Sequence, residues 1–116
     1  MEHGALEGRC PVEVALDVVG GKWKPMIIWR LCAGTLRFGE LQRAIPEVSQ
    51  RILTLQLREL ERDGLVTRTV YPEVPPRVEY SATETARRLE PVLRGLGQWM
   101  LDNYGEVRGS KDASAA

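Results

Sequence analysis

The sequence predicts one domain that is mainly α-helical and includes a small β-hairpin, an α+β fold class. Three observations predict it: two amphipathic runs flank a short break, two runs rich in β-branched residues follow them, and apolar helical segments lie on both sides. A chain of 116 residues is the size of a single domain, and small domains often gain stability by forming oligomers.

The first helix is expected over Pro11–Val19, because proline is well tolerated at the opening position of a helix. Its apolar stripe comprises Val12, Ala15, Leu16 and Val19. After a break at Gly20 and Gly21, a second helix is expected over Lys24–Ala33. This segment is apolar nearly all round, which predicts that it occupies the buried centre of the fold.

Two further helices are expected over residues 38–45 and 49–63, separated only by residues 46–48. Ser49 is a natural N-cap, and Gly64 lies just past the last helical residue, where glycine commonly ends a helix. Two helices joined by so tight a turn are typical of a helix-turn-helix, in which the second helix can enter the major groove of DNA.

The second of these helices separates its residues by face at 100° per residue. Leu53, Leu57 and Leu60 form a stripe that must pack on a core. The opposite face suits phosphates and guanine edges, because a guanidinium group matches paired acceptors. The candidate DNA contacts on this helix are Ser49, Gln50, Arg51, Thr54, Leu55, Arg58 and Arg62.

Leu55 is an apolar residue on that outward face, where it could contact a thymine methyl group. The alternative is that the arginines of this face form i,i+4 pairs with Glu59, Glu61 and Asp63 and are simply solvated. The helix by itself favours neither alternative. The elements that flank this helix favour DNA binding over a solvated charged face.

Residues 65–71 and 77–81 are rich in β-branched residues and surround a turn-rich segment, which predicts a β-hairpin. A helix-turn-helix followed by a hairpin is a winged helix. Its wing, residues 66–81, would reach the flanking DNA backbone or minor groove.

Arg77 at the base of the wing is its first candidate DNA contact, and Arg68 is the second. The alternative, which the sequence leaves open, is that Arg77 pairs with Glu73 or Glu79. Two more candidate phosphate contacts lie at the start of the second helix, Lys22 and Lys24; the alternative is that both are simply solvated.

The last helix is expected to begin near Thr83, and Pro91 should bend it or split it in two. Its apolar surface is wider than a terminal helix of one small domain needs. The surface comprises Val92, Leu93, Leu96, Trp99 and Met100. Either it covers the helix-turn-helix of its own chain, or part of it packs on a second subunit.

Six motifs occur in order along the chain. They are Cys10-Pro11-Val12-Glu13, Gly20-Gly21-Lys22-Trp23, Arg37-Phe38-Gly39-Glu40-Leu41, Ser49-Gln50-Arg51, residues 57–66 and residues 71–80. This series resembles the HxlR-type winged-helix transcriptional regulators, small bacterial proteins related in architecture to the MarR group. The resemblance spans about residues 10–104 and implies a homodimer that binds double-stranded DNA at an operator with two related half-sites, with Arg37 among the DNA contacts.

The resemblance favours the second alternative for the terminal helix, because a two-fold protein matches a two-fold operator. The predicted dimer interface comprises Val12, Leu16, Val92, Leu96, Trp99 and Met100. The chain departs from the family pattern at Ala82, where leucine is usual, and at Ala86, where glycine is usual. Neither position lies on the predicted DNA face.

Cys10 lies just before Pro11, at the cap of the first helix, where the helix dipole and free N–H groups favour a thiolate. Several members of the family sense oxidants or electrophiles through a cysteine in this place, so the resemblance implies a redox sensor. The alternative is that Cys10 is packed, protonated and inert. Cys32, late in an apolar helix, is expected to be a small buried hydrophobe.

Composition excludes several classes of protein. Sixteen basic and sixteen acidic residues give zero net charge, which argues against a non-specific nucleic-acid coat but not against local clustering. The sequence shows neither a metal-ligand cluster nor a phosphate-binding glycine loop nor a nucleophile–base pair, so no enzyme, metal or cofactor is expected.

The sequence also lacks a signal-peptide pattern and a membrane-length apolar run, which predicts a cytoplasmic protein. Residues 1–9 and 105–116 are expected to be disordered tails. A small-molecule effector is compatible with the sequence but not indicated by it. The alternative function is a winged-helix module for protein interaction or dimerisation without DNA readout.

Overall fold

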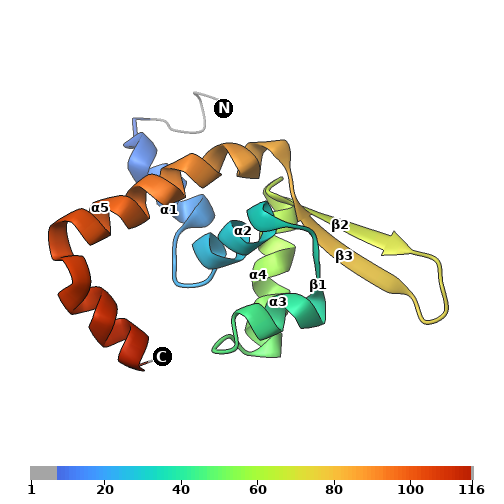
Figure 1. Ribbon diagram of the computed structural model, residues 1–116. Helices are drawn as coiled ribbons and strands as arrows, with labels where there is room; N and C mark the ends of the chain where they lie inside the picture. The colour runs from blue at the N-terminus through green and yellow to red at the C-terminus, as the bar shows by residue number, and fades with distance from the viewer. Residues whose placement is uncertain (1–7, 116) are drawn as a thin grey trace.

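A computed structural model describes the backbone of residues 8–115 and the side chains of residues 8–105. It confirms the predicted fold class, because helices surround a small antiparallel sheet in the arrangement of a winged helix (Figure 1). The elements are α1 Pro11–Val19, α2 Lys24–Ala33, β1 Leu36–Arg37, α3 Phe38–Ala44, α4 Gln50–Arg62, β2 Val66–Tyr71, β3 Arg77–Ala82 and α5 Glu84–Ala115.

Helices α1 and α2 have the predicted bounds, and one prediction about the α2 face is wrong. In α1 it is Val14 that is buried, whereas Val12 and Leu16 are exposed. In α2 the expectation of burial all round is wrong, because Met26 and Trp29 are exposed. The α2 side chains that are completely buried are Ile27, Ile28 and Leu31.

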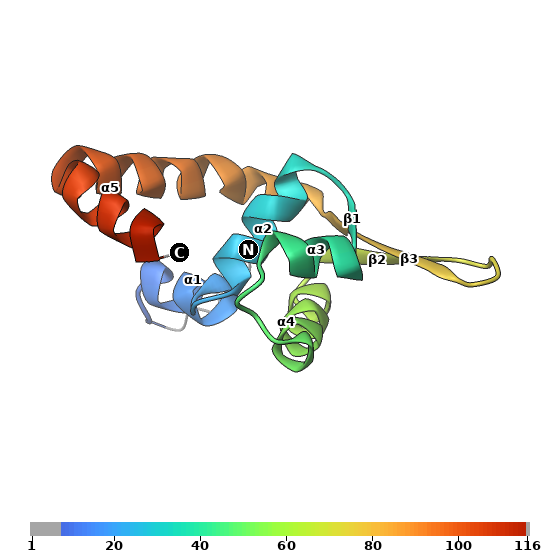
Figure 2. The same cartoon turned by 60° about the horizontal axis from the view of Figure 1, so that its bottom comes forward.

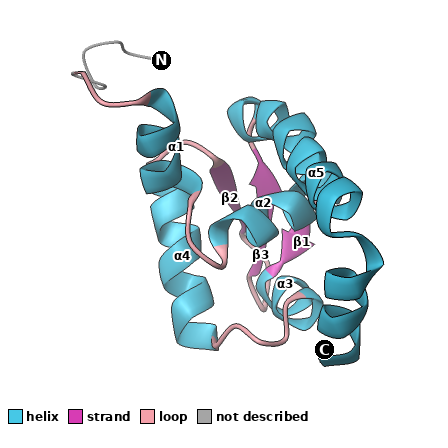
Figure 3. Cartoon of the chain, turned by 90° about the vertical axis from the view of Figure 1, so that its left-hand side faces the viewer, coloured by secondary structure: helices cyan, strands magenta, loops and turns pink. Residues whose placement is uncertain are grey.

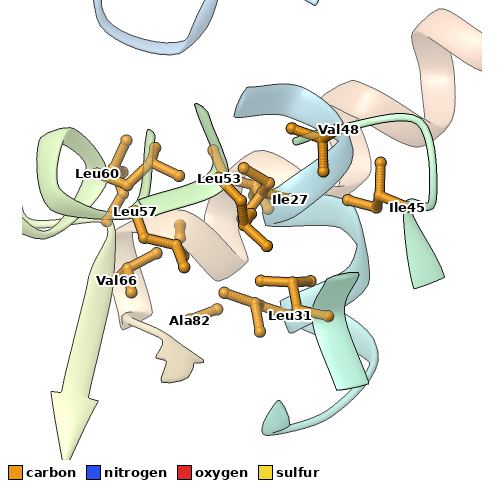
Figure 4. Close-up of a cluster of buried hydrophobic side chains, with 13 residues drawn as sticks. Ile27, Leu31, Ile45, Val48, Leu53, Leu57, Leu60, Val66 and Ala82 are labelled. Carbon is orange, nitrogen blue, oxygen red and sulfur yellow. The ribbon is translucent and has the colours of Figure 1, made fainter. Parts of the chain in front are cut away.

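The core lies where α2, α3, α4, the sheet and the start of α5 meet (Figure 4). The predicted leucine stripe of α4 is its centre, since Leu53, Leu57 and Leu60 are at most 2% exposed. They pack in one cluster with Ile27 and Leu31 of α2. Packing on this scale is the main favourable term in the folding of a small domain. It fixes which side of α4 faces outward.

Both ends of α4 have the predicted caps. The Ser49 hydroxyl accepts a hydrogen bond from the backbone N–H of Ile52 at 3.1 Å. At the other end, Gly64 has a φ of +79°, a conformation that glycine adopts at little cost. The N–H of Leu65 then bonds to the Leu60 carbonyl at 2.9 Å. These contacts fix the helix between the turn at residues 46–48 and the wing.

The sheet has the strand order β1-β3-β2, and all pairs are antiparallel. Strands β2 and β3 form the wing in a register from Val66↔Ala82 to Tyr71↔Arg77, and the hairpin projects from the body of the molecule (Figure 2). Strand β1 is absent from the sequence-based prediction, because two residues are too few to show a period.

Helix α5 begins after Thr83, as predicted. The Thr83 hydroxyl accepts from the N–H of Ala86 at 3.3 Å and donates to the Gly64 carbonyl at 2.7 Å. Of the two outcomes predicted for Pro91, a bend or a split, the split does not occur, because the backbone stays helical there. The interruption lies at Gly105, with φ 56° and ψ −151°.

The two predicted tails fall at the edges of the described region. Residues 1–7, most of the expected N-terminal tail, lie outside the described residues. The backbone of α5 continues past Gly105 to Ala115, where the sequence predicts a disordered tail. None of the helices in the described part of the chain is long and apolar enough to cross a membrane.

Figure 3 shows α2 between α4 and α5, so α2 contacts both the helix-turn-helix and the terminal helix.

Candidate nucleic-acid interface

The outward face of α4 gathers most of the predicted DNA contacts on one surface. Arg51, Arg58 and Arg62 are exposed, and Leu55 is 46% exposed although it is apolar. A shallow hollow of about 670 Å³ lies over this face. It is lined by Gln50, Arg51, Thr54, Leu55 and Arg58. The recognition face, as we call these five residues, is therefore continuous and open to solvent.

The arginines of α4 differ in whether they form an ion pair. Arg62 binds Asp63, with Nε 3.1 Å from Oδ1, and this hydrogen bond holds the pKa of the Asp63 carboxyl below its usual range. Within residues 8–105, Arg51 and Arg58 form no ion pair. The alternative of i,i+4 pairing thus fails for the two arginines of the recognition face, whereas Arg62 is engaged by its own neighbour.

A second cleft, of about 440 Å³, lies between α4 and the sheet. Arg58 and Arg68 both line it, together with Tyr80 and Glu61. The two guanidinium groups therefore border one cavity from different elements, the recognition helix and the wing. A phosphate beside the cleft would meet both groups, with the Glu61 carboxylate opposing it.

Arg77 adopts the alternative that the sequence left open. Its guanidinium pairs with Glu73 at 3.2 Å and with Glu79 at 3.3 Å, and it stacks on the Tyr71 ring with Cζ 3.9 Å from the centroid. The side chain is only 30% exposed. Arg77 is therefore not the first candidate DNA contact of the wing, because its guanidinium group is already paired and stacked within the hairpin. Arg68, which is exposed on β2, is the better placed wing residue.

Lys24 also requires a correction, because it is buried. The residue is 8% exposed, and its Nζ lies 2.7 Å from Glu59 Oε1. It is therefore unavailable to a phosphate. Lys22 stays exposed, with Nζ 4.8 Å from the centroid of the Trp23 ring. Arg37 is exposed just before α3, and its backbone N–H donates to Glu40 Oε1 at 2.8 Å.

The predicted dimer residues form exposed apolar surface near both ends of the described chain. Val12 and Leu16 of α1 are more than 60% exposed, as are Val92 and Leu96 of α5. Trp99 is 52% exposed, and Met100 is half-buried. A groove of about 800 Å³ runs between α2 and this part of α5. Its lining includes Met26, Trp29, Leu96 and Trp99. Apolar surface of this extent on a small domain is typical of an interface.

The two cysteines differ as the sequence predicts in their positions. Cys10 is exposed at the N-cap of α1. Cys32 is half-buried, and its thiol donates to the Ala86 carbonyl at 3.7 Å. Burial raises the pKa of the Cys32 thiol, so less of it is the nucleophilic thiolate.

Known proteins decide the family. The protein-family model described as HxlR-like helix-turn-helix matches residues 18–108 of the chain. The chain belongs to this family. The HxlR-like proteins similar to it are transcriptional regulators and not enzymes.

Two relatives illustrate the similarity. The chain is 54% identical over 90 residues to the HTH-type transcriptional regulator YdeP of Bacillus subtilis (strain 168), covering 78% of this chain and 70% of YdeP. It is 50% identical over 112 residues to an HTH-type transcriptional regulator of Methanothermobacter thermautotrophicus, covering 95% of this chain and 86% of the relative. The HxlR-like match thus extends over both the helix-turn-helix and the wing.

Solved structures agree with the family. The redox regulator HypR in its oxidised form is 53% identical and superposes with a TM-score of 0.76, covering 81% of this chain and 97% of HypR. The reduced form of the transcriptional regulator YodB from B. subtilis is 37% identical, with a TM-score of 0.73, covering 81% of this chain and 93% of YodB. A MarR-family regulator from Porphyromonas gingivalis W83 is 38% identical, with a TM-score of 0.77, covering 83% of this chain and 94% of that protein, which agrees with a MarR-like winged helix.

The sequence did not identify the Lys24–Glu59 pair. Glu59 was considered only as a partner of arginines on its own helix, whereas it pairs with α2. Two signals point to the pair in retrospect. A lysine opens an otherwise apolar helix, and Glu59 lies on the flank of α4 between the leucine stripe and the recognition face. Neither signal names the partner, because the contact joins residues that are far apart in the chain.

Proposed function

We propose that this HxlR-like protein is a sequence-specific DNA-binding transcriptional regulator that acts in the cytoplasm as a homodimer on a pseudo-palindromic operator. Helix α4 would lie in the major groove, and the wing would contact the flanking backbone or minor groove. The observation that carries the proposal is the recognition face. Its two exposed arginines, Arg51 and Arg58, form no ion pair within residues 8–105 and stand beside an exposed leucine, Leu55, that does not enter the core.

Dimerisation is supported by the exposed apolar faces of α1 and α5. Val12, Leu16, Val92 and Leu96 would each leave water on association, which is favourable in proportion to the apolar area buried. Because the net charge of the chain is zero, its overall electrostatic attraction to DNA is weak. Affinity must then come from specific contacts, and two recognition faces supply more of them than one. A two-fold dimer presents both faces to one duplex.

Footprinting on the DNA that flanks the protein's own gene tests this function. We expect two protected regions whose centres are separated by about 10–10.5 base pairs or a multiple of this spacing. Affinity should fall with rising salt by roughly 0.9 powers of salt concentration for each phosphate contacted. Sedimentation at the same protein concentration provides the mass of the bound species. Protection of one unrepeated region by a monomer would contradict the proposal.

We further propose that Cys10 makes DNA binding responsive to oxidants or electrophiles. Cys10 is exposed at the N-cap of α1, two residues from Val12 of the proposed dimer interface. A modification there would alter how α1 packs on a second subunit, and hence the spacing of the two recognition faces. HypR and YodB have been solved in different redox or diamide-treated states, which supports the proposal by analogy.

The variant Cys10→Ser should bind DNA normally and lose any response of that binding to diamide or a quinone. The measurement is a gel-shift or anisotropy titration with and without the reagent. Cys32→Ser is the matched control and should keep the response, because its thiol is half-buried with a raised pKa. A full response in the Cys10→Ser protein would remove Cys10 from the mechanism.

A further inference from the structure

The Lys24–Glu59 pair joins the recognition helix to the centre of the fold. Lys24 is the only buried charged residue within residues 8–105, and its Nζ lies 2.7 Å from Glu59 Oε1. Within the same residues, this is the only ion pair that connects α4 to another element. The Arg62–Asp63 pair, by contrast, stays at the end of α4 itself.

The location of Lys24 is unfavourable unless the pair is formed. Lys24 is the first residue of α2, where the helix dipole is positive and disfavours a cation, and the first turn of α2 contains no acidic residue. Burial adds a desolvation cost of several kcal/mol for an unpaired ammonium group. Glu59 lies in the last turn of α4, where the negative end of that helix also favours a nearby cation. The charge that compensates for the cost of burying the Lys24 ammonium group therefore comes from α4.

The pair supplies a directional restraint that the leucines do not. Leu53, Leu57 and Leu60 bind α4 to the core through apolar contacts, which are non-directional and tolerate small rotations of the helix. An ion pair at 2.7 Å has a much narrower range of geometries. Glu59 is on the flank of the helix, so its contact with α2 restrains rotation of α4 about its own axis as well as tilt.

The restraint matters at the other end of the helix. Glu59 is eight residues beyond Arg51 in the chain, which is about 12 Å along the helix axis. A tilt of roughly 10° about Glu59 would displace Arg51 by about 2 Å, more than the tolerance of a hydrogen bond to a base. Phosphate contacts made by flexible side chains would survive such a shift more easily than contacts with base edges.

We propose that Lys24 is a positioning residue for DNA readout. Its pairing with Glu59 sets the angle at which the recognition face meets base edges, so it determines specificity more than stability. The proposal rests on the proposed function. Buried ion pairs often add little net stability relative to apolar replacements, and in some proteins they select one conformation among several.

The test compares the wild-type protein with the double variant Lys24→Met, Glu59→Met. The probes are a duplex that the wild-type protein enriches from a random-sequence pool and a scrambled duplex of the same composition. We expect the double variant to unfold at the same or a higher temperature. Its preference for the enriched duplex should fall at least roughly ten-fold, which is about the discrimination supplied by one good contact with a base edge. Affinity for the scrambled duplex should not change.

Two further variants complete the comparison. Lys24→Arg keeps the ion pair and should keep most of the preference. Arg88→Met with Glu84→Met removes an exposed ion pair of α5, whose side chains are 78% and 73% exposed, and should change nothing. Should the Met/Met variant fail to fold, Glu59→Gln is compared instead, because its amide oxygen still offers Lys24 an acceptor while the charge is lost.

Three results would overturn the proposal, and they are distinguishable. Unchanged preference in a folded variant would show that the pair has no positioning role. Equal losses on both duplexes, with a salt dependence smaller by about one phosphate, would make Lys24 a backbone contact. Failure of the wild-type protein to enrich any sequence would remove the proposed function, and this inference with it.

Discussion

Replacing Leu53 with alanine is expected to lower the free energy of unfolding by about 2–5 kcal/mol. Leu53 is completely buried in the middle of α4, in the same cluster as Ile27 and Leu31 (Figure 4). Removing its branched end deletes apolar contacts from α2 and leaves a cavity that a close-packed core fills only partly. Because small domains are stable by only about 5–15 kcal/mol, the loss is a large fraction of the total.

The measurement is urea unfolding followed by circular dichroism, at one fixed protein concentration because association stabilises the folded state. Leu55→Ala is the matched control, since it makes the same change two residues further along α4. Leu55 is 46% exposed, so its removal should change the free energy of unfolding by no more than about 0.5 kcal/mol. Equal losses in the two variants would mean that protein covers the recognition face.

The double variant Arg51→Ala, Arg58→Ala is expected to lose at least roughly 30-fold in affinity for the footprinted DNA. Each truncation costs about 1–3 kcal/mol if the guanidinium contacts a base edge, and two such losses combine. Stability should not fall, because both side chains are exposed and neither forms an ion pair within residues 8–105. Fluorescence anisotropy at moderate salt measures the affinity, and thermal unfolding verifies the fold.

The control for this experiment is Arg88→Ala, which removes an exposed arginine of α5 that pairs with Glu84. Its affinity should match that of the wild-type protein. The single variant Arg58→Ala refines the result, since a base contact relaxes the preference at one base pair per half-site. A uniform loss on all sequences would make Arg58 a phosphate contact. An Arg51, Arg58 double variant that binds as tightly as the wild type would favour the protein-interaction module instead.

Local sequence signals were sufficient to predict the helices and the two strands of the wing, but not the two-residue strand β1. Proline at the start of α1 and serine at the start of α4 act within one turn of chain, so the bounds of α1 and α2 were predicted without error and those of α4 to within one residue. The division of α4 into a buried and an exposed face was predicted for the same reason. A period of 3.6 residues determines which residues share a side, whatever the helix packs against.

Features that depend on the folded surroundings were predicted less well, even where the residues involved are close in the chain. Arg77 was offered equally as a DNA contact and as a partner of acids, and only the hairpin register shows that it lies between Glu73, Glu79 and the Tyr71 ring. Pro91 was expected to bend α5 or split it in two, and the helix continues through it without a split. Proline removes one hydrogen bond, and whether a helix tolerates the loss depends on the packing around it.

Signals within a few residues of one another were therefore sufficient to predict the helices, the two strands of the wing, the leucine stripe of α4 and the arginines opposite to it. The folded structure was needed to show that β1 joins the wing, that Met26 and Trp29 face outward, and that Lys24 is buried against Glu59. The physical reason is that burial and ion pairing depend on which elements meet in space. In a chain of this size those meetings join residues tens of positions apart, and no local pattern specifies them.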